Sequence, residues 1–319
     1  MDHRSSETFL TCSLPEVELL AIQNGRHYFN ITLTITCENE NNQTFFTSKS
    51  KQVRVYGRTE HAISIYTMIR NKRNEIIDWI EYHRMIGIEH FYLYDNLSED
   101  HIDIFLKYYL DQDIVTIVKW PFRPIRNQHW NMIQCASMNH ALKNFGPFNK
   151  WMGYFDVDEY FQLNDTNEQL ILGRKKSLVE LLDQSFPETK FPGGVQFYNC
   201  PISCFLSQEE ILSSRHLNIF QKCNSIVEPR DCFRRTKLFI RPQNVPFMRS
   251  IHLLERGIIF SARNELSNFG QFRHYHYGFI SEKGDRRGKF DNSMNKFIVN
   301  LTQRISLFYR THCPELKIY

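Results

Sequence analysis

The chain has 319 residues, enough to bury a full-sized core, and its 42% hydrophobic and 23% charged content is ordinary for a globular protein. A net charge of +4 over this length is too weak to indicate a nucleic-acid partner. No apolar run approaches the roughly 20 residues that span a bilayer, and the N-terminus lacks the pattern of a signal peptide. We therefore expect the chain to be soluble as given, reaching a membrane only through an anchor that is not present in it.

Eight cysteines and five Asn-x-Ser/Thr sequons bear on the compartment. No two cysteines form a Cys-x-x-Cys pair, and Cys200 and Cys204 have no histidines at the spacing of a zinc site. An even number of cysteines permits disulfides, and reduced buried thiols are the alternative. The sequons, which favour the secretory pathway, lie at Asn30, Asn42, Asn96, Asn164 and Asn300.

The N-terminal part, residues 1–58, is predicted to be a β-rich segment. His27 to Cys37 alternates polar and apolar side chains as a half-buried strand does, and Thr44 to Tyr56 follows a polar turn in the same way. Neither stretch carries residues typical of catalysis. One large domain is predicted to follow, over residues 59–319.

Strands and helices alternate in the first half of that domain. Strands are predicted at 62–69, 88–94, 114–118 and 151–155, with helices at 76–83, 102–109 and 134–145 between them. This order predicts an α/β fold with a Rossmann-like, mostly parallel sheet. In the second half we predict a helix near 178–182, strands at 193–197, 237–241 and 251–254, and a last helix at 292–309.

Polar residues follow three of the predicted strands: Arg70-Asn71, Asp95-Asn96 and Asp156 to Asp158. Ligands of such sheets bind beyond the carboxyl ends of the strands, so these side chains are expected to share one crevice. The third group, Asp156-Val157-Asp158-Glu159, places three acids within four residues after an apolar strand. Alternation would point Asp156 and Asp158 to the same side, where both could bind one hard cation, and a solvated acidic turn is the alternative.

Several motifs over about His61 to Tyr277 together resemble a known family. They are Asn71 with Asp78-Trp79-Ile80 and Tyr82-His83, Gly87 to His90, Tyr94 to Ser98, Gln134 to Leu142, Trp151 with Phe155 to Phe161, Lys237 to Pro242, and His274-Tyr275. This set resembles glycosyltransferase family 92, the domain of unknown function 23 group, most specifically in its first half. Lys72 departs from the family, which often carries Glu there, and Glu75 is the residue that would substitute.

The resemblance implies a glycosyltransferase-A fold and a metal-dependent, inverting transfer of a hexose, typically galactose from UDP-galactose, onto a glycan acceptor in the Golgi lumen. It implies that Asp158 binds Mn²⁺ or Mg²⁺ and that Asp156 reaches the metal or the donor ribose. His274 would be a third metal ligand, with His276 and His252 as alternatives.

Four further residues are expected to contact the donor from their places in such a fold: Arg70, Asn71, Asp95 and Gln134, with Arg126 as another candidate. Ordinary turn and capping contacts are the alternative for each, and the better interpretation for Asn96.

Inversion also requires a general base that takes the proton of the acceptor hydroxyl. Acids between the metal motif and the final histidine qualify by position. The prediction is Asp231, and the alternatives are Glu228, Glu210 and Glu209.

Two other functions are weighed against this one. A haloacid-dehalogenase-type phosphatase also uses Asp-x-Asp, but on its first strand and with Thr or Val where this chain has Tyr160. A catalytically inactive carbohydrate-binding protein of the same fold would not need both Asp156 and Asp158, and it stays the alternative prediction.

Overall fold

The structure is a computed structural model that describes residues 28–33, 36–38, 44–47, 51–56, 60–124, 129–203, 219–223, 225–226, 236–254, 268–275, 289–290 and 293–312. The chain divides into two compact units, Met1–Glu60 and His61–Tyr319. In the first unit, strand β1 (Tyr28–Leu33) pairs antiparallel with β4 (Lys51–Tyr56). Strand β2 (Thr36–Glu38) pairs in the same sense with β3 (Thr44–Thr47).

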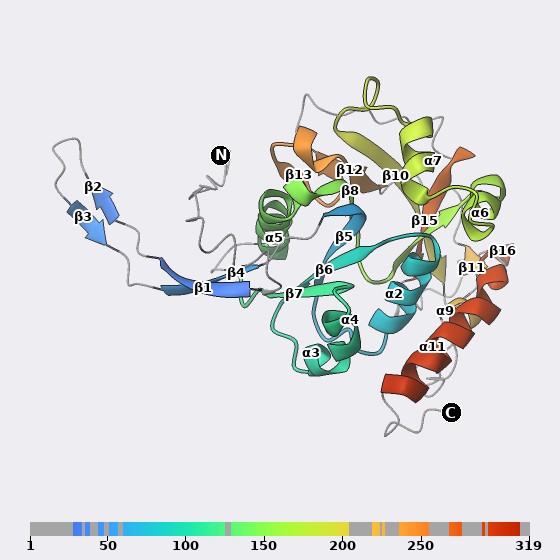
Figure 1. The fold of residues 1–319 in the computed structure, drawn as a ribbon, viewed down its shortest axis with the longest axis horizontal. Helices are drawn as coiled ribbons and strands as arrows, with labels where there is room; N and C mark the ends of the chain where they lie inside the picture. The colour runs from blue at the N-terminus through green and yellow to red at the C-terminus, as the bar shows by residue number, and fades with distance from the viewer. Residues whose placement is uncertain are drawn as a thin grey trace. The chain divides into compact units, whose positions relative to one another are not determined.

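Four parallel strands form one half of the sheet of the second unit, in the order β7-β6-β5-β8 (Figure 1). They are β5 (His61–Ile69), β6 (His90–Asp95), β7 (Val115–Lys119) and β8 (Asn149–Tyr154). The intervening helices are α2 (Ile76–Met85), α3 (Ile102–Phe105), α4 (Lys107–Asp111) and α5 (Trp130–Asn144). The alternation of strands and helices predicted from the sequence is confirmed, except that the helix expected at 102–109 is broken at Leu106.

Alternation along these buried strands gives the sheet two different faces. Ile63 and Ile65 of β5 belong to the apolar core together with Trp79 of α2. Tyr66 points the other way, and its hydroxyl oxygen lies 2.5 Å from the Ser137 hydroxyl oxygen on α5. Helices α2 and α5 therefore cover opposite faces (Figure 1).

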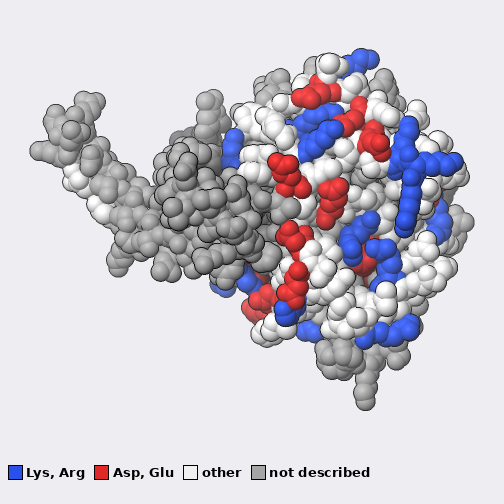
Figure 2. Space-filling view, in the orientation of Figure 1, with Lys and Arg blue, Asp and Glu red and all other residues white. Residues whose placement is uncertain are grey.

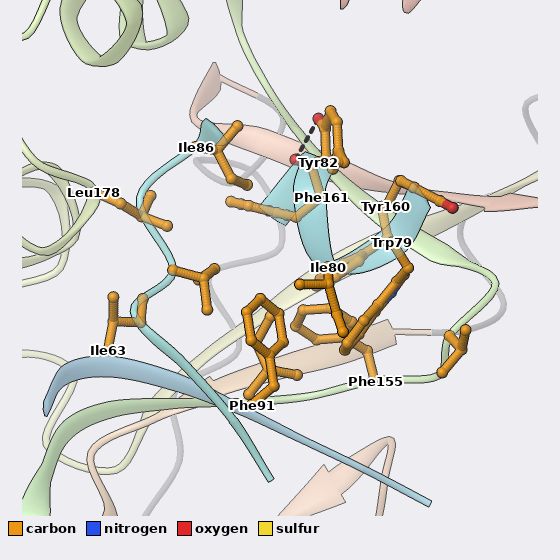
Figure 3. Close-up of a cluster of buried hydrophobic side chains, with 14 of the residues drawn as sticks. Ile63, Trp79, Ile80, Tyr82, Ile86, Phe91, Phe155, Tyr160, Phe161 and Leu178 are labelled. Atoms are coloured by element: carbon orange, nitrogen blue, oxygen red, sulfur yellow. Dashed lines mark hydrogen bonds between the residues drawn. The ribbon is translucent and has the colours of Figure 1, made fainter. Parts of the chain in front are cut away.

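The apolar face is dominated by aromatic rings between the sheet and α2 (Figure 3). Trp79 lies 5.4 Å from Phe91 and 5.8 Å from Phe155, measured between ring centroids. The Tyr82 hydroxyl donates a hydrogen bond of 2.9 Å to the carbonyl of Phe161. Each buried side chain of this size contributes roughly 1.5–3 kcal/mol of transfer free energy, so this cluster fixes α2 against the strands that carry the acids.

The other half of the sheet is mixed in direction. Strand β12 (Thr236–Ile240) runs antiparallel to β8, and β10 (Gly194–Ser203) runs antiparallel to β12. Strand β15 (Gly270–Tyr275) is parallel to β10 and antiparallel to β9 (Glu159–Leu163). The α/β fold class is therefore confirmed, with the parallel arrangement concentrated in the first four strands.

The remaining elements are short, apart from the last helix. They are α6 (Asp165–Leu172), α7 (Leu178–Ser185), α9 (Ile219–Lys222), β11 (Ser225–Ile226), β13 (Met248–Ser250), β14 (Leu253–Leu254), β16 (Lys289–Phe290), the 3-10 turns Gly146–Phe148, Pro242–Asn244 and Asn295–Phe297, and α11 (Ile298–His312). Two predictions change: the strand expected at 251–254 is the β13–β14 hairpin, and the last helix begins at Ile298 instead of residue 292. No helix in the described part of the chain has the length and apolar character needed to cross a membrane.

Candidate functional site

The three acids lie on a tight turn between β8 and β9. The Glu159 amide donates to the Asp156 carbonyl at 3.0 Å, and the Asp156 amide donates to Glu159 Oε2 at 2.8 Å. The backbone is held from both sides, because Trp79 Nε1 donates to the Glu159 carbonyl at 2.9 Å and the Tyr275 amide donates to the Asp158 carbonyl at 2.7 Å. The expected strand alternation at Asp156 to Asp158 is therefore wrong: these residues turn, and the two aspartates have different neighbours.

Strand pairing brings His274 to this turn. In the antiparallel ladder of β9 and β15, His274 lies directly opposite Glu159. Its Nε2 is 3.4 Å from Asp158 Oδ2, and its Nδ1 is 3.9 Å from Glu159 Oε1. Residues more than a hundred positions apart in the sequence thus converge, as the family resemblance implied for Asp158 and His274.

The electrostatics of this pair favour charged forms. Burial by itself raises the pKa of the Asp158 carboxyl, but His274, Lys72 and Lys237 outweigh it and bring the pKa to about 2. Burial by itself lowers the pKa of His274, yet the neighbouring Asp158 and Glu159 carboxylates raise it above its ordinary value. Without a metal, the imidazole and the carboxylate therefore form an ion pair at pH values below the raised pKa of His274.

Asp156 and Glu159 are joined by a buried lysine. Lys237 of β12 places its Nζ 2.7 Å from Asp156 Oδ2 and 2.8 Å from Glu159 Oε2. Burial lowers the pKa of this ammonium group, but the two carboxylates raise it above its ordinary value, so the lysine is charged. Gln134 of α5 approaches the other oxygen of Asp156, with Nε2 at 3.3 Å from Oδ1.

The residues available to a metal ion are oxygen and nitrogen donors. Atoms of Asp158, Glu159 and His274 lie within 4.8 Å of one another. Asp158 Oδ1 is buried and has no hydrogen-bond partner among the described residues, which is costly for a carboxylate oxygen unless a cation binds there. Carboxylate and imidazole ligands suit Mn²⁺, so the residues present fit the expected metal.

The loop after β5 also faces the turn. Lys72 Nζ lies 3.6 Å from Glu75 Oε1, and both side chains are half-buried. Burial raises the pKa of Glu75, and the Asp158 charge raises it further, while Lys72 lowers it. Lys72 therefore forms an ion pair with Glu75, and the expectation that Glu75 substitutes for a glutamate at position 72 stays a prediction.

Arg70 and Asn71 begin this loop. Arg70 is exposed. Asn71 has a positive φ of 52°, donates its amide to Ser98 Oγ at 3.0 Å and accepts from the Glu99 amide at 2.8 Å. The structure gives Asn71 a turn role, and the donor contact expected of both residues stays a prediction.

Asp95 and Asn96 end β6 and hold the neighbouring loops. Asp95 is 3% exposed and accepts hydrogen bonds from the Ser98 amide and from Lys119 Nζ. Asn96 Nδ2 donates to the carbonyls of Trp120 and Phe122. The structure thus gives Asn96 the turn chemistry expected of it, while the donor contact of Asp95 stays a prediction.

Several candidate residues lie outside the described part of the chain: Arg126, Glu209, Glu210, Glu228, Asp231 and His276. Of the two alternative histidines, His252 is described. Its Nδ1 lies 2.7 Å from the Thr236 carbonyl oxygen, and it does not belong to the Asp158 group.

Sequence reasoning placed Lys237 at the start of a strand and within a family motif, but missed its contact with the acids. The available signal was a lysine at the first position of an otherwise apolar run, Leu238-Phe239-Ile240, which forces a charged group into the sheet. On the outer surface, by contrast, basic and acidic side chains are interspersed on the face shown in Figure 2.

Comparisons with known proteins agree on one family. The sequence model of glycosyltransferase family 92 matches residues 60–306. A glycosyltransferase family 92 protein of Ricinus communis is 33% identical over 108 residues, 34% of this chain and 18% of that protein. One of Oryza sativa subsp. japonica is 29% identical over 118 residues, 36% of this chain and 19% of that protein. The matched stretches span less than a fifth of the length of these curated relatives.

Among solved structures, residues 1–349 of S. aureus TarS match 44% of this chain and 36% of that chain. The TM-score is 0.29 and the sequence identity 12%, values too low to support an argument.

Proposed function

Because the chain belongs to glycosyltransferase family 92, we propose that it is a metal-dependent, inverting glycosyltransferase that moves a hexose, galactose from UDP-galactose, onto a glycan acceptor. The observation that carries the proposal is the pairing of Asp158 with His274 at the carboxyl end of β8. It includes a buried carboxylate oxygen without a hydrogen-bond partner and lies where ligands of parallel sheets bind.

In this proposal Asp158 and His274 hold Mn²⁺ or Mg²⁺. The bound cation supplies neutralisation of the charge that develops on the departing nucleotide diphosphate. Asp156, kept in place by Lys237 and Gln134, presents its remaining lone pairs to the cation or to the donor ribose. Arg70, Asn71 and Asp95 are proposed to contact the nucleotide from the ends of β5 and β6.

The acceptor side is proposed from chemistry alone. A carboxylate must take the proton of the acceptor hydroxyl as its oxygen attacks the anomeric carbon from the face opposite the diphosphate. Asp231 is the proposed base, with Glu228, Glu210 and Glu209 as alternatives.

We propose the Golgi lumen as the compartment. Cys200 and Cys223 each take part in a disulfide bond, and disulfides persist in the oxidising secretory pathway. Two of the sequon asparagines differ in exposure. Asn300 is exposed on α11, whereas Asn96 is 0% exposed. The Asn96 side chain also donates to the Trp120 carbonyl, so Asn96 is unsuited to carry a glycan.

The test is release of UDP from several UDP-hexoses, with and without glycan acceptors, in the presence and absence of Mn²⁺. We expect Mn²⁺-dependent release that Asp158→Ala removes and that Asp165→Ala, an exposed acid on α6, leaves unchanged. Binding of UDP-hexose without turnover of any donor would favour the catalytically inactive carbohydrate-binding protein. Equal release by Asp158→Ala would contradict the site assignment.

A further inference from the structure

A buried lysine side chain contacts two of the three carboxylates of the acidic turn. Lys237 is 2% exposed, and its Nζ contacts Asp156 Oδ2 and Glu159 Oε2 at 2.7 and 2.8 Å. It comes from β12, whose next residue, Leu238, pairs with Tyr154 of β8, two positions before Asp156. The lysine is therefore fixed by the sheet and does not depend on a mobile loop.

Both carboxylate oxygens of Glu159 already accept hydrogen bonds. Oε2 accepts from Lys237 and from the Asp156 amide, and Oε1 accepts from Asn199 Nδ2 at 2.5 Å. Glu159 is therefore poorly placed to bind a metal directly, although it lies within the Asp158 group. Its remaining effect is on His274, whose Nδ1 it faces at 3.9 Å.

Asp156 is held differently, with one oxygen on Lys237 and the other at 3.3 Å from Gln134. The Asp156 side chain is 36% exposed. Lys237 and Gln134 therefore orient it, while the rest of its surface stays accessible to a ligand. Apart from the Lys72–Glu75 ion pair, the three carboxylates of the turn and the Lys237 ammonium leave two formal negative charges, which favour binding of a divalent cation at Asp158 and His274.

We propose that Lys237 is a positioning residue for the donor. Its ammonium group orients Asp156 toward the nucleotide sugar and holds Glu159 next to His274 instead of on the metal. The site therefore binds one divalent cation, through Asp158 and His274. This inference rests on the proposed function. It assigns to Lys237 an effect on nucleotide affinity that a purely structural buried ion pair would not have.

A matched control for a purely structural role lies at the end of the same strand. Arg241 is 4% exposed, donates to the carbonyls of Phe191 and Phe186 at 2.7 Å, and stacks 3.9 Å above the centroid of the Trp151 ring. Its ion-pair partner is Asp183 at 3.3 Å, not one of the three acids of the turn. Loss of Arg241 should therefore cost stability without changing the donor site.

The experiment measures dissociation constants of Mn²⁺ alone, and of UDP in saturating Mn²⁺, by calorimetry, together with the melting temperature. The chains compared are the wild type, Lys237→Met, Lys237→Arg and Arg241→Met. We expect Lys237→Met to bind Mn²⁺ no more weakly than the wild type, because a nearby positive charge is removed. Its affinity for UDP should fall roughly 10- to 100-fold, as for other residues that orient metal-site ligands. Lys237→Arg, which keeps the charge, should recover part of that loss.

A double variant provides a second test in case the Lys237→Met chain does not fold. Glu159→Gln with Lys237→Met removes both charges of the buried pair, so no unpaired buried carboxylate is left at Glu159. It should show the same selective loss of UDP affinity.

Unchanged UDP affinity in the folded Lys237 variants, or an equal loss in Arg241→Met, would overturn the role of Lys237 and leave the proposed function standing. If the wild-type chain binds neither Mn²⁺ nor UDP, the proposed function falls and this inference falls with it.

Discussion

In the proposed metal site, a proton and a metal ion would compete for the same atoms of Asp158 and His274. The imidazole Nε2 that faces Asp158 Oδ2 at 3.4 Å is the nitrogen that we propose as the metal ligand. Because the neighbouring carboxylates raise the pKa of His274 despite its burial, the protonated imidazole is favoured in the metal-free protein. Metal binding must then displace that proton.

We predict that Mn²⁺ affinity rises with pH above 6.5, the ordinary pKa of histidine, until His274 has lost its proton. Titrations at fixed ionic strength between about pH 6 and 9 would measure this. His274→Gln should bind Mn²⁺ more weakly, and its affinity should not vary with pH over the same range. A pH dependence that persists in His274→Gln would assign the proton to another group.

The same pair has an opposite effect on the stability of the metal-free chain. The folded pKa of His274 lies above its unfolded value, so its stabilisation is present below pH 6.5 and is lost as pH rises through the folded pKa. Asp158, with a folded pKa of about 2 against an ordinary 3.8, contributes stability above pH 3.8 that is lost as pH falls toward 2.

At this scale the sequence singled out the acids of the turn but not their neighbours. Asp156 and Asp158 are conspicuous because charged residues seldom follow so apolar a strand, and His274 came from the family resemblance. Lys237 could not be placed, since its partners depend on the pairing of β12 with β8, which no local pattern encodes. Alternation also failed for Asp156 and Asp158 because a hydrogen-bonded turn replaces the strand there.

Among the elements, the junction of β10 with β12 sets the position of Lys237. Gly194 begins β10 with a φ of +122°, and a Cβ there would lie 2.3 Å from the Phe239 carbonyl oxygen and 2.5 Å from Ile240 Cα. Gly87, after α2, has a similar φ of +101°, but the nearest atom to its Cβ would be 3.7 Å away. A side chain at either position would therefore strain the backbone, but only at Gly194 would its Cβ also clash with backbone atoms.

We predict that Gly87→Ala costs about 1–2 kcal/mol of unfolding free energy, the penalty of the left-handed backbone alone. Gly194→Ala should cost at least about 2 kcal/mol more, because backbone atoms of β12 must move. Urea unfolding of both variants measures the difference. Similar losses of unfolding free energy in the two variants would mean that β12 shifts at little energetic cost and would contradict this prediction.

Helix α11 packs Leu301, Ile305 and Phe308 into the core and also bonds to a buried acid of α2. Glu81 of α2 is 4% exposed and accepts from Arg84 and from the Tyr109 hydroxyl, while its second oxygen accepts from Arg304 of α11 at 2.6 Å. We predict that Glu81→Ala lowers the unfolding free energy by about 1–3 kcal/mol, since it leaves the buried Tyr109 hydroxyl without its acceptor, whereas the partly exposed Arg84 and Arg304 stay in contact with water. Denaturant unfolding and amide exchange of α11 would measure it. Lys107→Met, which removes an exposed pair with Asp111, is the control and should cost less than about 1 kcal/mol.

Element prediction succeeded where the pattern is local and periodic, as in β5 to β8. It missed β9, in which all five residues are buried although Glu159 and Gln162 are polar, so neither alternation nor an apolar run is visible. The prediction also missed how the strands of the second half pair, because the antiparallel and parallel pairings of β10, β12 and β15 join residues far apart in sequence.

Over the whole molecule, the residues of the proposed site belong to one compact unit with a mixed α/β sheet, His61–Tyr319. The family match begins at residue 60, and the described strands of Met1–Glu60 pair only with one another. Residues 59–319 are accordingly proposed as an independent domain, following a separate β-rich segment at 1–58.

We predict that residues 61–319 produced alone fold cooperatively, because the strands, helices and acidic turn described for this unit need no strand from the first unit. The melting temperature should lie within about 4 °C of that of the full chain, the shift expected for roughly 1 kcal/mol in a domain of this size. Mn²⁺ affinity should be the same within about twofold, a difference below roughly 0.5 kcal/mol. Thermal unfolding and calorimetry on both chains provide the measurement, with the Asp158→Ala variant of each as the control for specific metal binding. A shortened chain that aggregates, or that folds but loses Mn²⁺ binding, would show that the N-terminal segment completes the domain, and the boundary near residue 59 would have to be abandoned.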